Sequence, residues 1–322
     1  MRLSLEIPGT PLRHHPRWDE ILSRAPILRN IGNTPLLDIS RQAGAKPGVK
    51  VMAKLEGTNP GGSVKDRPAL YMVMAALIEG KLGGGKILLD STSGNTGIAY
   101  AMIGAALGFP VELCLPENAS FERKKLMEAY GAKIHYTDPM EGSEGSRWVA
   151  EAMYKKEPEK YFLPDQYNNP NNPRAHYETT GPEIWEATGG KVTHFLAGIG
   201  TSGTLMGTGR YLKAQNPRVT VYAVEPDHPL HGLEGLKHMA SAKVPGIYDP
   251  SWLDGIINIP TEEGYRAAVR IAKEGILVGA SAGAALAAAT RVAQQIDEGL
   301  IVTVFPDGGG RYLSTGLFDP EK

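Results

Sequence analysis

Short apolar runs alternate with longer segments of helix-forming residues along most of the chain. The apolar runs predict strands, and the segments between them predict helices. The predicted strands are 50–55, 86–90, 111–115, 133–136, 192–196, 219–224, 276–278 and 300–305. The predicted helices are 18–24, 65–77, 96–107, 120–130, 145–156, 282–295 and one that ends near 215. Because short strands that alternate with helices imply parallel sheets with crossover connections, we expect an α/β fold with two sheets.

Length, charge and hydropathy narrow the class of protein. With 322 residues, of which 42% are hydrophobic, the chain can bury a large core in two domains or one large, split domain. Its net charge of −1 argues against nucleic acid or a membrane surface as the main partner. No apolar run approaches the roughly 20 residues that span a bilayer, and the N-terminal residues lack the hydrophobic region of a signal peptide. We therefore expect a cytoplasmic protein.

The single cysteine, Cys114, excludes an internal disulfide and a metal site built from several cysteines. It lies in the apolar run 111–115, which favours a buried and unreactive thiol. No metal site is predicted.

The stretch 59–68 combines a turn, two glycines and a lysine at the start of a predicted helix. Ser63 occupies a good N-cap position, and Lys65 falls in the first turn. Because a helix N-terminus carries partial positive charge, a lysine there is locally unfavourable. Desolvation would lower the pKa of its ammonium and yield a neutral amine that acts as a nucleophile. The alternative is a lysine whose head group simply reaches the solvent.

Three loops rich in glycine and hydroxyl groups, 91–97, 198–204 and 279–283, each lie between a predicted strand and a predicted helix. Glycines let the backbone approach a ligand, and helix N-termini bind anions. In open α/β sheets such loops lie at the carboxyl ends of strands, where ligands bind. The chain has no P-loop motif, but 198–203 matches Gly-x-Gly-x-x-Gly. The loops predict an anionic ligand, and a dinucleotide is one candidate.

Five motifs resemble those of the cysteine synthase and cystathionine β-synthase family of pyridoxal-phosphate-dependent enzymes. They are 31–36, 59–67, 92–97, 179–185 and 311–315. The matches extend from about residue 27 to 318 and follow the family's order. Details in 193–195, 204–210 and 244–248 resemble the cysteine synthase B branch.

This resemblance implies an α/β enzyme of fold type II, tryptophan synthase β-like, with parallel-type twisted sheets flanked by helices. It implies a large cofactor-binding domain formed by 1–58 and 169–322, with an N-terminal arm at 1–30. It also implies a smaller, mobile domain formed by 59–168, and a cofactor in the cleft between the two domains.

The resemblance implies that Lys65 is the catalytic residue, which holds pyridoxal 5'-phosphate as a Schiff base and then transfers the substrate's α-proton. The other cofactor-binding residues that it implies are Asn95, Gly200, Thr201, Ser202, Gly203, Thr204 and Ser281. The family usually has glycine where Ser202 stands; a serine is expected to fit there and to add a donor. A hydroxyl of Ser281 on the pyridine nitrogen leaves that nitrogen largely neutral, which suits elimination at Cβ.

The substrate-binding residues that the resemblance implies are Thr92, Ser93, Asn95, Thr96, Gln166 and Lys237. All of them except Lys237 would hold the carboxylate of the amino acid, although Ser93 and Thr96 could also cap the following helix. Cysteine synthase B relatives place a cation, usually arginine, near Lys237. A cation there would favour an anionic substrate or sulfur donor; the alternative is a solvated lysine on a mobile loop.

The implied reaction is a β-replacement. An activated L-serine, either O-acetylserine or O-phosphoserine, loses its β-substituent, and a sulfur nucleophile adds to the aminoacrylate to give L-cysteine. The alternative within the family is cystathionine β-synthase, in which homocysteine is the nucleophile. An alternative of another class is an inactive binding protein, against which the intact lysine loop argues. The resemblance also implies a homodimer, and it leaves open a serine acetyltransferase or a sulfur-carrier protein as a partner.

Overall fold

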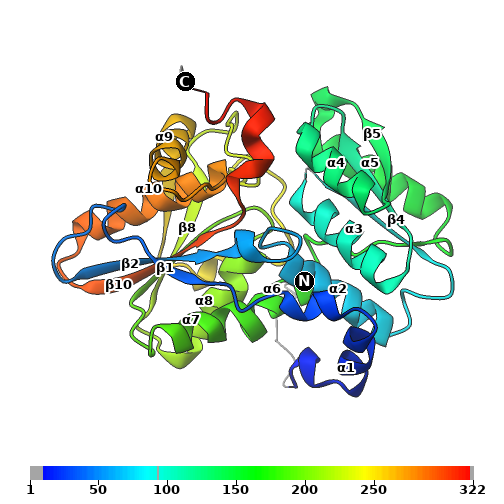
Figure 1. Cartoon of the computed structure of the whole chain (residues 1–322), viewed down its shortest axis with the longest axis horizontal. Coiled ribbons are helices and arrows are strands. Elements are labelled where there is room, and N and C mark those ends of the chain that lie inside the picture. Colours follow the sequence, from blue (N-terminus) through cyan, green and yellow to red (C-terminus); the bar gives the residue numbers. More distant parts are fainter. Residues whose placement is uncertain (1–9, 93, 320–322) are drawn as a thin grey trace. The chain divides into compact units, whose positions relative to one another are not determined.

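The computed structural model describes residues 10–92 and 94–319, and its contacts divide them into two compact units. The first unit contains residues 32–58 and 173–319, and the second contains residues 10–31 and 59–172 (Figure 1). Within residues 10–92 and 94–319 the chain therefore passes from one unit to the other three times, at 31/32, 58/59 and 172/173. We call these points the first, second and third passage.

A six-stranded sheet forms the centre of the first unit. Its strands in spatial order are β1 (Leu36–Asp38), β2 (Val49–Leu55), β10 (Gly299–Phe305), β7 (His194–Gly198), β8 (Thr220–Pro226) and β9 (Gly255–Ile259). The edge strand β1 pairs antiparallel with β2, and the other pairings are parallel. Thr303 on β10 lies opposite Ala53 on one side and Leu196 on the other, which fixes the central register.

Helices cover both faces of this sheet. Figure 1 shows α9 (Thr261–Ala272) and α10 (Ala280–Gln295) on one face, with α7 (Gly181–Ala187) and α8 (Gly203–Gln215) on the other. The alanine-rich α10 is buried along most of its length, because its small side chains let it lie close to the sheet and to α9. This packing forms the core of the unit, which also includes Val51, Leu196 and Ile301.

The second unit is built on a four-stranded parallel sheet. Its strands in order are β5 (Lys133–Thr137), β4 (Val111–Pro116), β3 (Ile87–Ser91) and β6 (Tyr161–Phe162). Its helices are α1 (Pro16–Ser23), α2 (Asp66–Ile78), α3 (Asn95–Leu107), α4 (Phe121–Ala129) and α5 (Gly142–Lys156). Strand β4 is buried along its whole length. Cys114 on β4 is fully buried, as predicted, and burial raises the pKa of its thiol to about 12.

The α/β class and most predicted elements are confirmed, but three differences have physical causes. The predicted strand 276–278 is wrong: within the described residues Val278 makes an isolated bridge to Gly308, because the run leads directly into α10. The edge strand β9 and the amphipathic helix α9 that follows it were not predicted. Strand β9 contains three isoleucines, but it is only five residues long and Gly255 and Asn258 interrupt its apolar pattern.

Residues 10–31, the described residues before the first passage, belong by their contacts to the second unit. Its helix α1 matches the predicted helix 18–24 and packs on α2, since the rings of Trp18 and Tyr71 lie 5.1 Å apart. The Arg17 guanidinium also donates to the carbonyl of Ile78, at 3.0 Å. The arm is therefore held by the helix that follows the Lys65 loop.

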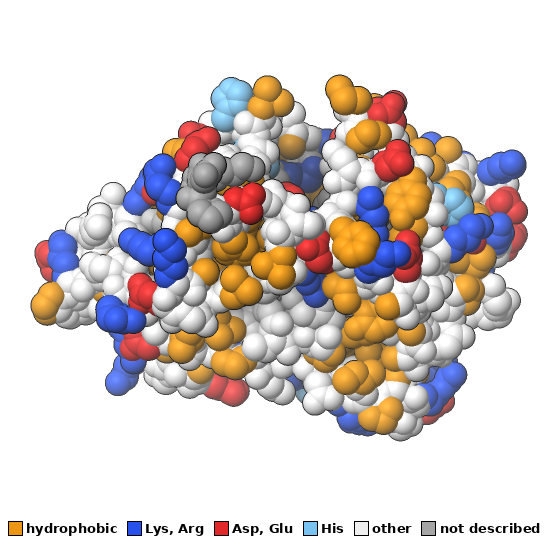
Figure 2. Space-filling view, turned by 45° about the horizontal axis from the view of Figure 1, so that its top comes forward, with side chains coloured by type: hydrophobic (Ala, Val, Ile, Leu, Met, Phe, Trp, Pro, Cys, Tyr) orange, Lys and Arg blue, Asp and Glu red, His pale blue; other side chains and the backbone are white. Residues whose placement is uncertain are grey.

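The surface carries charges of both signs. On the face seen in Figure 2, Lys and Arg side chains are interspersed with Asp and Glu side chains, in keeping with the net charge of −1. Among the helices of the described residues, none is long and apolar enough to cross a membrane.

Candidate functional site

The predicted site residues fall in both units. The second unit holds Lys65, Thr92, Asn95, Thr96 and Gln166, and the first unit holds Gly200–Thr204, Lys237 and Ser281. Ser93 lies outside the described residues. The geometry of each group can be followed within its own unit.

The Lys65 loop folds back on itself before α2 begins. The Gly62 amide donates to the carbonyl of Asn59 at 2.7 Å, and Gly62 adopts a φ of 79°, in the left-handed region. The Asn59 side-chain amide in turn donates to the carbonyl of Ser63 at 3.1 Å. The Lys65 amide donates to the Ser63 hydroxyl at 3.2 Å, but the predicted N-cap role of Ser63 is wrong, because α2 begins at Asp66 and Lys65 occupies the N-cap position.

Lys65 is the residue immediately before α2, and it is half-buried. Its neighbour Asp66 is fully buried and accepts the Gly61 amide at 2.5 Å. A carboxylate at the first position of a helix is favourable, because it faces the positive end of the helix dipole. The loop thus presents one lysine from a backbone that is hydrogen-bonded on both sides of it.

The loop between β3 and α3 is organised by Thr92. Its hydroxyl accepts the amides of Gly94 and Gly97, at 3.0 and 3.1 Å, so Thr92 caps α3. Thr96, for which capping was an alternative, instead donates its hydroxyl to the Gln166 amide oxygen at 2.9 Å. The Gln166 nitrogen donates to the carbonyl of Ser91 at 3.3 Å. The structure therefore brings Thr96 and Gln166 together, although 70 positions separate them in the sequence.

The glycine-rich loop after β7 leads into α8 through an uncommon backbone conformation. Ser202 adopts a φ of 74°, which glycine would adopt without strain. The Ser202 side chain is buried, and its hydroxyl has no hydrogen-bond partner among the described residues. A Cβ on Gly200 would lie 2.3 Å from the carbonyl oxygen of Gly235, so only glycine fits there. A buried hydroxyl at the N-terminus of a helix is suited to an anion.

His176 supports this loop, and the sequence analysis missed it. One ring nitrogen lies 2.9 Å from the Thr180 hydroxyl, and the other lies 3.3 Å from the Thr204 hydroxyl. The His176 side chain is 1% exposed, so these bonds fix its orientation. A lone histidine in a helical segment gives no sequence signal, because its partner Thr204 lies 28 positions away.

Lys237 and Ser281 occupy two further parts of the first unit. The Lys237 amide donates to the carbonyl of Ile199 at 2.7 Å, so its backbone runs beside the glycine-rich loop, and its side chain is half-buried. Ser281 is buried in the first turn of α10. The Gly279 amide before it donates to the carbonyl of Asp307 at 3.3 Å, which ties the start of α10 to the end of β10.

A small cavity lies behind the 91–97 loop in the second unit. Its volume is about 30 Å³, and its lining includes Asp90, Arg147, Asp165 and Tyr167. Burial raises the pKa of Asp90 to about 7, and the charge of Asp165 adds to this effect, while the amide of Ser91 opposes it. Asp90 thus keeps its proton over a range in which an exposed aspartate is ionised.

The chain is similar to known pyridoxal-phosphate dependent proteins over most of its length. The family described as "Pyridoxal-phosphate dependent enzyme" matches residues 27–307. A cysteine synthase of Aquifex aeolicus is 52% identical over 92% of this chain and 93% of its own length. A cysteine synthase B of Pseudomonas aeruginosa is 42% identical over 90% of this chain and 96% of its own. The solved cysteine synthase of Entamoeba histolytica has a TM-score of 0.87 and 36% identity, covering 92% and 91% of the two chains.

The raised pKa of Asp90 predicts a pH-dependent stability that Asp90→Asn removes. Between the ordinary value of 3.8 and about 7, the folded state holds a proton that the unfolded state has lost. This carboxyl therefore lowers the free energy of unfolding as pH rises, by up to about 1.4 kcal/mol per pH unit. Urea unfolding at several pH values in that window should show a smaller decrease for Asp90→Asn than for wild type. The exposed Asp19→Asn is the control, and equal slopes in all three proteins would contradict the assignment.

Proposed function

Because the chain belongs to the family of pyridoxal-phosphate dependent enzymes, we propose that it is a cysteine synthase, which replaces the β-substituent of an activated L-serine by sulfur. The observation that carries this proposal is the similarity to two cysteine synthases over at least 90% of the chain. The fold and the intact lysine loop support it, because a protein that only bound ligands would not need the lysine.

The residues of the first unit fit the phosphate of pyridoxal phosphate. The loop before α8 offers backbone N–H groups, a helix N-terminus and the buried Ser202 hydroxyl, which lacks a partner among the described residues. His176 holds the Thr204 hydroxyl at the same loop. We assign Gly200, Thr201, Ser202, Gly203 and Thr204 to the phosphate, Ser281 to the pyridine nitrogen, and Asn95 of the second unit to the ring oxygen.

When bound, the cofactor supplies an electron sink for loss of the α-proton and of the β-substituent. Lys65 would hold the cofactor covalently through Nζ and, as the free amine, would move the α-proton at that atom. The hydrogen-bonded backbone around Lys65 fixes the point from which its side chain extends, which favours a defined position for proton transfer.

Thr92, Ser93, Asn95, Thr96 and Gln166 are assigned to the carboxylate of the amino acid. The bonds from Thr96 to Gln166 and from Gln166 to Ser91 pre-position two of these groups. We further propose that residues 59–168 form a mobile smaller domain that closes when the carboxylate binds. Closure would exclude water from the reacting carbons.

One assay series tests the reaction. O-acetylserine, O-phosphoserine and serine are each combined with sulfide, thiosulfate and homocysteine, and the sulfur-containing amino acid is measured. Cysteine formed from an activated serine supports the proposal. Efficient use of homocysteine alone would instead identify a cystathionine β-synthase, and no product from any pair would reject the proposed function.

We also propose that the protein is a cytoplasmic homodimer. A serine acetyltransferase or a sulfur-carrier protein is the proposed protein partner, since one would supply the activated serine and the other the sulfur. Light scattering of the purified protein measures the oligomeric state, and a monomer that remains fully active would overturn the homodimer.

Lys65→Ala should abolish turnover and remove the visible absorbance of the lysine-bound cofactor. The cofactor should still bind without a covalent bond, because the 200–204 loop is unchanged. Absorbance spectra before and after dialysis measure both effects. Lys81→Ala changes an exposed lysine of the same unit and should behave as wild type. A Lys65→Ala protein that keeps the wild-type spectrum after dialysis would contradict the assignment of Lys65 as the residue that binds the cofactor covalently.

Ser202→Gly should have opposite effects on the protein without and with cofactor. Glycine relieves the left-handed strain, which stabilises the cofactor-free protein by about 1 kcal/mol. Loss of the hydroxyl removes one donor to the phosphate and weakens cofactor binding by about tenfold. Thermal unfolding of the cofactor-free protein and equilibrium titration with pyridoxal phosphate measure the two effects. Unchanged cofactor affinity would show that the Ser202 hydroxyl does not touch the phosphate.

Lys237→Ala should lower kcat/KM for O-phosphoserine or thiosulfate by about tenfold, through loss of one charge-assisted bond. The loss for O-acetylserine with sulfide should be much smaller. The difference should shrink at high salt, because lysine acts as a point charge. Lys243→Ala, an exposed lysine of the same segment, is the control. Equal losses for neutral and anionic partners would refute an anion-binding role.

A further inference from the structure

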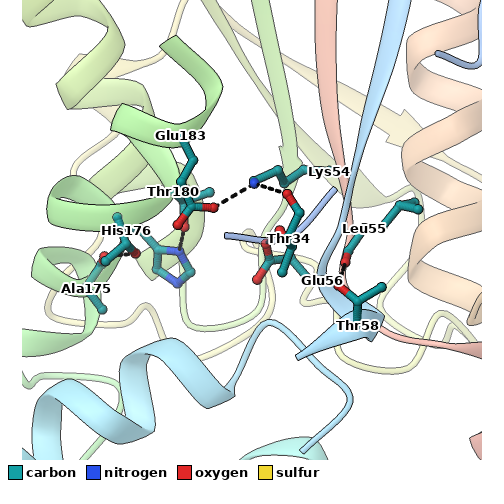
Figure 3. Close-up of polar contacts among 10 residues, drawn as sticks. Thr34, Lys54, Leu55, Glu56, Thr58, Ala175, His176, Thr180 and Glu183 are labelled. Atoms are coloured by element: carbon teal, nitrogen blue, oxygen red, sulfur yellow. Dashed lines mark hydrogen bonds and ion pairs between the residues drawn. The ribbon is translucent and has the colours of Figure 1, made fainter. Parts of the chain in front are cut away.

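A buried polar cluster of the first unit lies beside all three passages. We call Thr34, Lys54, Glu56 and Glu183 the Lys54 cluster (Figure 3). Thr34 follows the first passage and Glu56 precedes the second, each by two residues. Glu183 lies on α7, which continues the helical run that starts at Asn171, beside the third passage.

Lys54 contacts two other members of the Lys54 cluster, Glu183 and Thr34. The Lys54 ammonium lies 2.6 Å from the Glu183 carboxylate and donates to the carbonyl of Thr34 at 2.5 Å. The Thr34 hydroxyl donates to the Glu56 carboxylate at 2.7 Å. The Lys54 side chain is 2% exposed, Glu56 is fully buried and the Glu183 side chain is 15% exposed, so water screens these interactions much less than it screens surface ion pairs. Lys54 itself is held in the sheet between Leu36 of β1 and Val304 of β10.

Glu183 lies on a helical run that extends back to the third passage, so the ion pair with Lys54 also holds that end of the run. Residues 171–187 form α6 (Asn171–Ala175), a π-helical turn (His176–Thr180) and α7 without a break. Within it, Arg174 pairs with Glu178 at 2.6 Å and His176 bonds to Thr180, so the run is braced along its length. An end fixed at Glu183 therefore fixes the other end, where the chain enters the first unit.

The burial of these charges needs a reason other than stability. Removing two charges from water is expensive, and well-packed apolar residues of the same size are often as stabilising as a buried ion pair. A charged hydrogen bond, however, defines distance and direction, which apolar contact does not. The ion pair is suited to holding segments in one geometry.

We propose that Lys54 and Glu183 are positioning residues for the reaction. Their ion pair holds the three passages of the described residues in one fixed arrangement at the first unit. The second passage leads directly into the Lys65 loop, whose first residue is Asn59, so the pair fixes where that loop begins. This inference rests on the proposed role of Lys65.

The test replaces the pair by apolar residues of similar size. Single variants Lys54→Met and Glu183→Met each leave one buried charge without its partner and should unfold more readily than wild type. The double variant Lys54→Met/Glu183→Met removes both charges and should recover most of that loss. If the pair has a positioning role, the double variant should bind pyridoxal phosphate yet show a kcat/KM lower by about 10- to 100-fold, mostly through kcat.

Hydrogen exchange gives a readout that does not depend on activity. In the cofactor-free double variant, backbone amides near residues 32–34, 56–58 and 173–176 should exchange faster together, while those of α9 and α10 should not change. The matched control is Arg291→Met/Glu263→Met, which removes an ion pair of the same unit between α10 and α9. It should alter kcat/KM by no more than about twofold and leave the passages unchanged.

Wild-type kcat/KM in the double variant, or unchanged exchange at the three passages, would overturn the inference. A double variant that cannot fold would overturn it too, because the pair would then serve the fold alone. Failure of the proposed function is distinguishable, since wild type itself would then lack cofactor absorbance and turnover.

Discussion

Parallel strand pairing is the constraint from which the location of the chemistry follows. In a parallel sheet every strand ends at the same edge, so the loops that follow neighbouring strands leave from that edge. In the first unit, the glycine-rich loop follows β7, and the end of β10 bonds to the start of α10. In the second unit, the 91–97 loop follows β3, which runs parallel to β4. The residues of the glycine-rich loop and of the 91–97 loop are each gathered by the sheet of their own unit, whereas Lys65 follows β2 of the first unit.

Close backbone contact then fixes the helix behind the glycine-rich loop. A Cβ on Gly207 of α8 would lie 2.1 Å from the carbonyl oxygen of Pro173, so α8 touches the residue that follows the third passage with no side chain between them. His176 adds a bond from the same segment to Thr204. The glycine-rich loop and the segment that follows the third passage are therefore both held against α8.

The sequence predicted features that depend on residues close together in the chain, and it missed features that depend on contacts between distant segments. Apolar runs such as 111–115 predicted buried strands, and the motif around Lys65 predicted the loop and its family. The bond between Thr96 and Gln166 and the role of His176 depend on contacts between distant segments, which no local pattern encodes. Helix α1 packs on α2 through the rings of Trp18 and Tyr71 and a hydrogen bond from Arg17 to Ile78, and a sequence rich in proline and arginine does not indicate these contacts.

The buried thiol of Cys114 has a consequence for a protein that handles sulfur compounds. Thiol–disulfide exchange requires an accessible thiolate, and a fully buried thiol with a pKa of about 12 offers neither access nor charge. The chain has no other cysteine, so the folded protein presents no partner for mixed disulfides with the sulfur compounds around it. The burial of Cys114 also makes the protein suitable for site-specific labelling, because a cysteine introduced at the surface would be its one reactive thiol.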